Sequence, residues 1–171
     1  MIDHAAGHPA LTDQPTGLAN RLHFDLVYGY LFEEGDRGMA LTVLLLSFGT
    51  GEFESSNPET LRKLGERIQD TTRNNDLAGH LGHGRIVILL FGSNIAGTLI
   101  AAERVEAAVG ELGIGRVSIG IAMYQAAMKE PSDLLEAAGP CVARRGGGWG
   151  RSGASVGGSG SPVARLVQQV V

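Results

Sequence analysis

The chain has 171 residues, of which 43% are hydrophobic, and its formal net charge is −4. This length favours one domain with a real core, and the acidic balance excludes a general affinity for nucleic acid or anionic membranes. A single cysteine, Cys141, excludes an internal disulfide and suits a reducing compartment. Neither a secretory signal pattern nor an apolar run of roughly 18 residues is present, so we predict a cytoplasmic protein without a membrane partner.

The first predicted elements are a helix and a buried strand. After a polar, irregular leader over residues 1–16, apolar residues from Leu18 onward follow helical spacing until the glycines of GDRG. The apolar positions with this spacing are Leu22, Leu26, Val27 and Tyr30, and the candidate caps are Asp13, Thr16 and Asn20. Residues 39–49, MALTVLLLSFG, form a nearly unbroken apolar run, which is typical of a strand covered on both faces.

The middle of the chain predicts a helix followed by a hairpin. Asn57 and Pro58 supply a cap and a first helical residue for a helix that ends near Thr72. Two short apolar stretches then flank Gly82-His83-Gly84, and glycine can take the positive φ angles that a hairpin turn requires. We therefore expect a hairpin over residues 77–91.

The second half predicts another helix and strand. Residues 95–112 have helical spacing and residues 115–124 return to a strand pattern, so the order of elements is that of an α/β (α+β), ferredoxin-like βαββαβ core. We expect a further helix over residues 132–144, with Gly139-Pro140 in its middle as a weakness. Residues 1–145 form the predicted domain, 146–161 a flexible Gly/Ser-rich linker, and 162–171 a closing strand or short helix.

Several segments resemble, in order and spacing, the GGDEF family of diguanylate cyclase domains in bacterial cyclic-di-GMP signalling. The opening DQPTGLANRLHF is similar to the family's D-x-L-T-G-L-x-N-R-x-x-F, from which Pro15 departs. RVSIGIA is similar to its V-S-I-G-I-A strand, and RNNDLAGHLGHGRIVILL aligns without gaps on R-x-x-D-L-x-x-R-x-G-G-D-E-F-x-x-L-L. The resemblance covers roughly residues 11–145 and implies a nucleotidyl cyclase fold with extra helices.

The hairpin tip departs from this family. Its Gly-Gly-Asp-Glu-Phe is replaced by Gly82, His83, Gly84, Arg85 and Ile86, so the acidic pair that the resemblance assigns to metal binding and hydroxyl activation is missing. Mg²⁺ requires hard, anionic oxygen ligands, and arginine repels it. We therefore predict no catalytic residue, no metal and no cofactor at this position.

Two further family segments are eroded. The D-I-D-x-F-K segment is here Ser47-Phe48-Gly49-Thr50-Gly51-Glu52, and the loop before Leu61, which the resemblance assigns to guanine recognition, is about six residues shorter than the family pattern. The A-D-x-A-L-Y-x-A-K signature is eroded to AAGPCVARRGGG, without a clear counterpart of its phosphate-binding lysine. We therefore predict that the chain is not an enzyme.

One ligand site of the family is retained. Arg73 and Asp76 have the spacing of its R-x-x-D inhibitory site (I-site) for cyclic-di-GMP, and Arg104 is the natural third arginine. Arginine donates bidentate hydrogen bonds to phosphate or a guanine edge, and Asp76 could accept from guanine. The alternative for Arg73 and Asp76 is a helix-terminal ion pair that contributes about 0 to 1 kcal/mol.

These observations leave two functions open. The first is a catalytically inactive cyclic-di-GMP receptor in which the ligand bridges two subunits; the second is a dimerisation or docking platform for another signalling protein. Among lesser signals, His80 and His83 fall short of a zinc site and are expected in a solvated turn. The Arg- and Gly-rich stretch around Trp149 is expected to be a solvated linker rather than a nucleic-acid contact.

Overall fold

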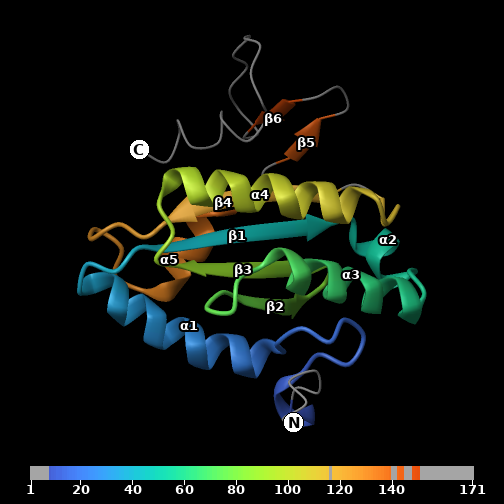
Figure 1. The fold of residues 1–171 in the computed structure, drawn as a ribbon, viewed down its shortest axis with the longest axis horizontal. Helices are drawn as coiled ribbons and strands as arrows, with labels where there is room; N and C mark the ends of the chain where they lie inside the picture. The colour runs from blue at the N-terminus through green and yellow to red at the C-terminus, as the bar shows by residue number, and fades with distance from the viewer. Residues whose placement is uncertain (1–7, 116, 140–141, 145–147, 151–171) are drawn as a thin grey trace.

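The computed structural model describes residues 8–115, 117–139, 142–144 and 148–150. Its centre is a four-stranded antiparallel sheet in the order β2-β3-β1-β4, with β2 and β4 outermost (Figure 1). This order is that of a ferredoxin-like βαββαβ core, so the predicted α+β fold is confirmed. The strands are β1 (Leu41–Phe48), β2 (Leu77–Gly82), β3 (Arg85–Phe91) and β4 (Val117–Met123).

The helices join these strands and cover the sheet. They are α1 (Arg21–Asp36), α2 (Thr50–Glu54), α3 (Pro58–Thr71), α4 (Ile95–Gly110) and α5 (Pro131–Ala137), preceded by a 3-10 turn, η1 (Pro9–Leu11). The sequence did not predict α2, a helix of only five residues whose Phe53 is buried against Phe48 at 5.4 Å between ring centroids. None of the described helices combines the length and the apolar character needed to cross a membrane.

Side chains of β1 alternate between two separate cores. Leu44 and Leu46 pack with α3 and α4, whereas Val43 and Leu45 pack with α1 and α5. The two faces of the sheet follow from the period of two in a strand. The residues of β1 from Leu41 to Leu46 are all buried, which confirms that the strand is covered on both faces.

The buried face of α1 differs from the apolar spacing that predicted the helix. Phe24, Tyr28 and Phe32 are buried; the rings of Phe24 and Tyr28 are stacked, and Phe32 meets Tyr28 edge to face. The predicted apolar positions Leu22 and Leu26 are instead more than half exposed. The aromatic side chains take the core position because they bury more apolar area than leucine does.

The predicted helix over residues 132–144 is wrong in its second half. Helix α5 ends at Ala137, and the backbone N–H of Gly139 donates to Glu136 O, which closes the last turn. Pro140 has no N–H to continue the ladder, so the helix stops before it. Beyond it, β5 (Val142–Arg144) pairs with β6 (Gly148–Gly150), so three residues of the predicted linker form a strand. The predicted C-terminal element, residues 162–171, lies outside the described residues.

Candidate functional site

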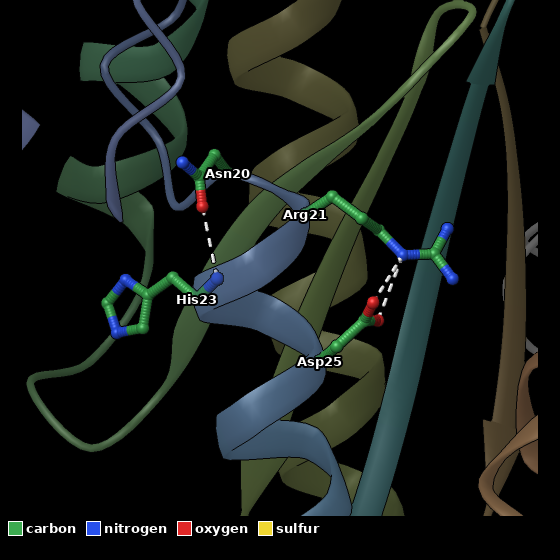
Figure 2. A network of polar contacts seen from close by, with 4 residues as sticks. All are labelled: Asn20, Arg21, His23 and Asp25. Atoms are coloured by element: carbon green, nitrogen blue, oxygen red, sulfur yellow. Dashed lines mark hydrogen bonds and ion pairs between the residues drawn. The ribbon is translucent and has the colours of Figure 1, made fainter. Parts of the chain in front are cut away.

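The opening segment, residues 13–20, is held by its own hydrogen bonds. One carboxylate oxygen of Asp13, Oδ2, accepts from Thr16 N at 3.1 Å and from Thr16 Oγ1 at 2.6 Å. Asn20, rather than Asp13 or Thr16, caps α1, because its side chain accepts from His23 N at 3.0 Å (Figure 2). The segment packs so closely on α3 that a β-carbon on Gly65 would lie 1.7 Å from Thr16 O.

His80 joins this segment to β2. Its Nδ1 lies 3.1 Å from Oδ1 of Asp13, its ring centroid lies 5.1 Å from that of Phe53, and its side chain is only 12% exposed. The prediction that His80 sits in a solvated turn is therefore wrong, whereas His83 is exposed as expected. The alignment of His80 on the arginine of R-x-G-G-D-E-F could have predicted this pair. Asp13 lies in the opening motif, and its carboxylate can accept a hydrogen bond from a histidine or from an arginine.

Burial alone raises the pKa of Asp13, but its hydrogen bonds outweigh that effect. The side chains of His80 and Thr16 donate to the carboxylate, and the pKa falls below its usual value of 3.8. Hydrogen bonds to the charged form favour that form. The carboxylate of Asp13 is thus a structural anion that fastens the opening segment to the sheet.

The hairpin tip is a tight two-residue turn. His83 and Gly84 both have positive φ, 52° and 67°, as a type I′ turn requires at its two central positions. A β-carbon on Gly84 would lie 3.2 Å from Phe48 O and 3.2 Å from Phe53 Cβ. An acidic side chain at this position, where the resemblance places aspartate, would therefore be strained. The side chain of Ile86, two residues later, is fully buried in the core.

Ser47 and Arg85, which the resemblance aligns with metal-binding carboxylates, offer no carboxylate to Mg²⁺. Arg85 lies directly opposite Ser47 in the β3–β1 pairing, so a guanidinium and a hydroxyl stand where two carboxylates are expected. Mg²⁺ prefers an octahedral shell that includes carboxylates. In the part of the chain that the structure describes, no group of three histidine, cysteine or acidic side chains could hold a metal ion.

The R-x-x-D segment forms a turn between α3 and β2. Asp76 N donates to Arg73 O at 3.0 Å, and Asp76 Oδ2 accepts from Arg73 N at 2.9 Å. Asn75 Nδ2 donates to Phe91 O at 3.2 Å and fixes the turn to β3. The carboxylate of Asp76 therefore caps the backbone of Arg73, and no ion pair between their side chains is found among the described residues.

The side chains of Asp76, Arg73 and Arg104 differ in burial and in their hydrogen-bond partners. The other oxygen of Asp76, Oδ1, is buried and has no hydrogen-bond partner within the described structure. Arg73 is exposed, as is Arg104 in α4, which packs beside α3 on the same face of the sheet. Among the described residues, no hydrogen bond or ion pair joins Arg104 to Arg73 or Asp76, so the structure does not bring the three predicted residues into one cluster.

Two cavities flank the first turn of α1, where His23 and Arg21 point in opposite directions (Figure 2). The first, of about 640 Å³, lies between the opening segment, α3 and the start of β2, and its lining includes His23 and Asp76. The second, of about 520 Å³, lies between α1, the ends of β1 and β3, and α5. Its lining includes Arg21, Ser47, Arg85 and Glu136. Sequence spacing could not predict that these four residues line one cavity, because their proximity depends on strand register and on where α5 ends.

Comparisons with known proteins agree with this architecture. The profile described as "Diguanylate cyclase, GGDEF domain" matches residues 10–145. The GGDEF domain of DgcB from Caulobacter crescentus, solved in complex with c-di-GMP, is similar with a TM-score of 0.66 and 18% identity, over 76% of this chain and 86% of that chain. SiaD from Pseudomonas aeruginosa, a diguanylate cyclase solved with its activator SiaC, gives 0.67 and 19%, over 75% and 55%. No curated protein matches the sequence.

Proposed function

The chain belongs to the GGDEF family, and from that membership we propose that it is a catalytically inactive member that acts as a cyclic-di-GMP receptor through Arg73, Asp76 and Arg104. Inactivity is supported by the donor set at the hairpin, where Arg85 and Ser47 replace the carboxylates that a two-metal phosphoryl transfer uses. A receptor of this kind binds cyclic-di-GMP without catalysing its formation. Its output is then a shift between two states that bind the ligand with different affinity.

The observation that carries the receptor proposal is the unpartnered oxygen of Asp76. A buried acceptor without a partner costs free energy, and a ligand that donates N–H groups recovers it. The guanine edge offers such donors, and the exposed guanidinium of Arg73 beside the same turn suits the phosphate or the base. Because the turn is fixed to β3 by Asn75, the acceptor is positioned before any ligand arrives.

Isothermal titration calorimetry with cyclic-di-GMP tests this site. We expect low-micromolar or tighter binding, roughly −8 kcal/mol, weakened tenfold or more by Arg73→Ala. Asp76→Asn is the sharper variant, because its amide oxygen can still accept from Arg73 N and keep the turn. Arg67→Ala, an exposed arginine on α3 outside the turn, is the matched control. Wild-type affinity in both site variants would reject the assignment.

Turnover of GTP tests the inactivity separately. The purified chain with GTP and Mg²⁺ or Mn²⁺ should form no cyclic-di-GMP, because the family's metal positions carry no carboxylate. Chromatographic detection of the product would overturn this half of the proposal and leave the binding half standing.

A docking platform is the second candidate, and the exposed face of α1 favours it. Leu22, Leu26 and Tyr30 follow one another at intervals of four residues and are 57%, 64% and 63% exposed. Side chains at this spacing form one stripe along a helix. If the stripe joins two copies of the chain, Leu26→Asp should convert a dimer to a monomer in sedimentation velocity, whereas a monomeric wild type would exclude this partner.

A further inference from the structure

The outer face of helix α1 carries an apolar stripe formed by Leu22, Leu26 and Tyr30. All three side chains are more than half exposed, and their spacing of four residues places them in one row along the helix. The opposite face of α1 carries its buried aromatic residues and packs on the sheet, so the stripe lies on the outside of the molecule (Figure 1). Large apolar side chains gathered on an exposed surface are typical of an interaction site.

The two ends of α1 carry opposite charges. Arg21 is the first residue of the helix, and Glu33, Glu34 and Asp36 lie in its last turn. A helix dipole favours the reverse arrangement, because its N-terminal end is partly positive and its C-terminal end is partly negative. The first turn of α1 has no acidic residue and its last turn has no basic residue. The charges at the ends of α1 therefore oppose its own dipole.

Each end of α1 keeps a charged group that is not fully paired within the chain. At the acidic end, Glu34 pairs with Arg37, whereas Glu33 is exposed and has no hydrogen bond or ion pair among the described residues. At the basic end, Arg21 donates only its Nε to Asp25, and its two terminal nitrogens extend past that carboxylate (Figure 2). A partner that is acidic beside Arg21 and basic beside Glu33 would complement both ends.

We propose that the stripe binds a second copy of this chain, with the two α1 helices antiparallel. A twofold axis beside Leu26 sets this residue against its own copy. Because a helix rises about 1.5 Å per residue, the same axis sets Leu22 beside the partner's Tyr30. It also brings Arg21 within one turn of the partner's Glu33, so the basic end of each helix lies beside the acidic end of the other. This interface rests on the proposed docking platform, to which it assigns a partner, and it needs no cyclic-di-GMP.

The charges favour this partner and this orientation over others. An α1 helix with opposite charges at its two ends is complementary to itself only when the second helix runs the other way. A parallel pair would set like charges side by side at both ends, which is unfavourable. The antiparallel pair also aligns the positive end of each helix dipole with the negative end of the other, and it lets each dipole meet the charge that it favours.

An exchange of charges, followed by sedimentation velocity of the full chain over a range of concentrations, tests the arrangement. Arg21→Glu and Glu33→Arg should each weaken the dimer about tenfold, because each creates two like-charge contacts about the twofold axis. The double variant should bind within about threefold of the wild type, because it reverses both ends together. Each single change gives its end of α1 the charge that the dipole favours, so a folded monomer is expected, and thermal melting checks this.

Two further variants separate the stripe from general effects of charge. Leu26→Asp should abolish the dimer, because it places a charge at the centre of the apolar contact. Arg67→Glu makes the same charge change as Arg21→Glu, but on α3, which packs on the opposite face of the sheet. This control should leave the dimer intact.

Three results would overturn the interface. They are a wild type that stays monomeric at every concentration, a dimer that survives Leu26→Asp, and a double charge variant that binds no more tightly than the single variants. The third result, with a dimer that Leu26→Asp still abolishes, would reject the antiparallel arrangement and leave the docking platform standing. Arg73→Ala should leave the dimer intact, so failure of the cyclic-di-GMP site and failure of this interface can be told apart.

Discussion

The opening segment and the hairpin tip differ in how their polar groups are used. In the opening segment, Asp13 accepts hydrogen bonds from Thr16 and lies against His80, so its charged carboxylate stabilises the fold. At the hairpin tip, Arg85 has no described ion-pair partner, and its charge is available to a ligand. Both segments align on family motifs, but one uses its charged group to hold the fold and the other leaves a charged group without a described partner.

The largest expected effect is on the contact between the opening segment and α3. Gly65→Ala places a β-carbon 1.7 Å from Thr16 O, and because a backbone oxygen cannot rotate away, the segment or the helix must move. We expect a loss of about 3 kcal/mol or more in the free energy of unfolding, measured by urea denaturation. Gly29→Ala in α1, where a β-carbon meets nothing within 4 Å, should instead stabilise by up to about 1 kcal/mol. Similar stability of the two variants would contradict the close approach.

A smaller effect is expected from removing the charge of Asp13. Asp13→Asn should destabilise the fold by about 1.5 to 3 kcal/mol at neutral pH, because charge-assisted hydrogen bonds are lost in a mostly buried place. Asp25→Asn, which loses an exposed ion pair on α1, is the matched control and should cost about 1 kcal/mol or less.

The same variant should change how stability depends on pH. The pKa of Asp13 is lowered in the folded chain, so its contribution is fully present above the unfolded value near 3.8 and is lost as pH falls through the folded value. Urea midpoints measured from pH 6 down to pH 2 should therefore fall less steeply in Asp13→Asn than in the wild type. Parallel curves would show that the carboxylate of Asp13 does not contribute to the pH dependence of stability.

The smallest effect compares two glycines at the hairpin tip. Gly84→Ala should cost about 1 to 3 kcal/mol, because a positive φ is combined with contacts of 3.2 Å to Phe48 and Phe53. Gly82→Ala also has a positive φ, but nothing lies within 4 Å of the added carbon, so about 1 kcal/mol is expected. Equal losses would mean that the turn is limited by φ alone.

Most of the fold could be predicted because its signals are local. Asn57 and Pro58 mark the start of α3, and the apolar run of β1 marks a strand with two covered faces. The buried side of α1 could not be predicted, because leucines at helical spacing and the aromatic residues Phe24, Tyr28 and Phe32 compete for one core face. The shape of the sheet beneath α1 decides which of the two sets of side chains is buried.

The candidate site was less accessible to sequence reasoning. The turn of Arg73 and Asp76 was recognisable from its spacing, but the orphaned oxygen of Asp76 depends on how that turn closes. The juxtaposition of Arg21 and Arg85 was out of reach because the two residues are far apart in the chain and meet only at one cavity. Register and helix endings, which sequence patterns define least well, decide both outcomes.

The contact of Ala19 with β2 covers part of an outer edge of the sheet. Ala19 N donates to Ala78 O, and Ala19 O accepts from His80 N, so backbone groups on the outer edge of β2 are already paired. An unpaired edge strand is a template for aggregation and strand exchange. A strand that added to this part of β2 would have to displace Ala19, whereas β4 forms the opposite edge of the sheet.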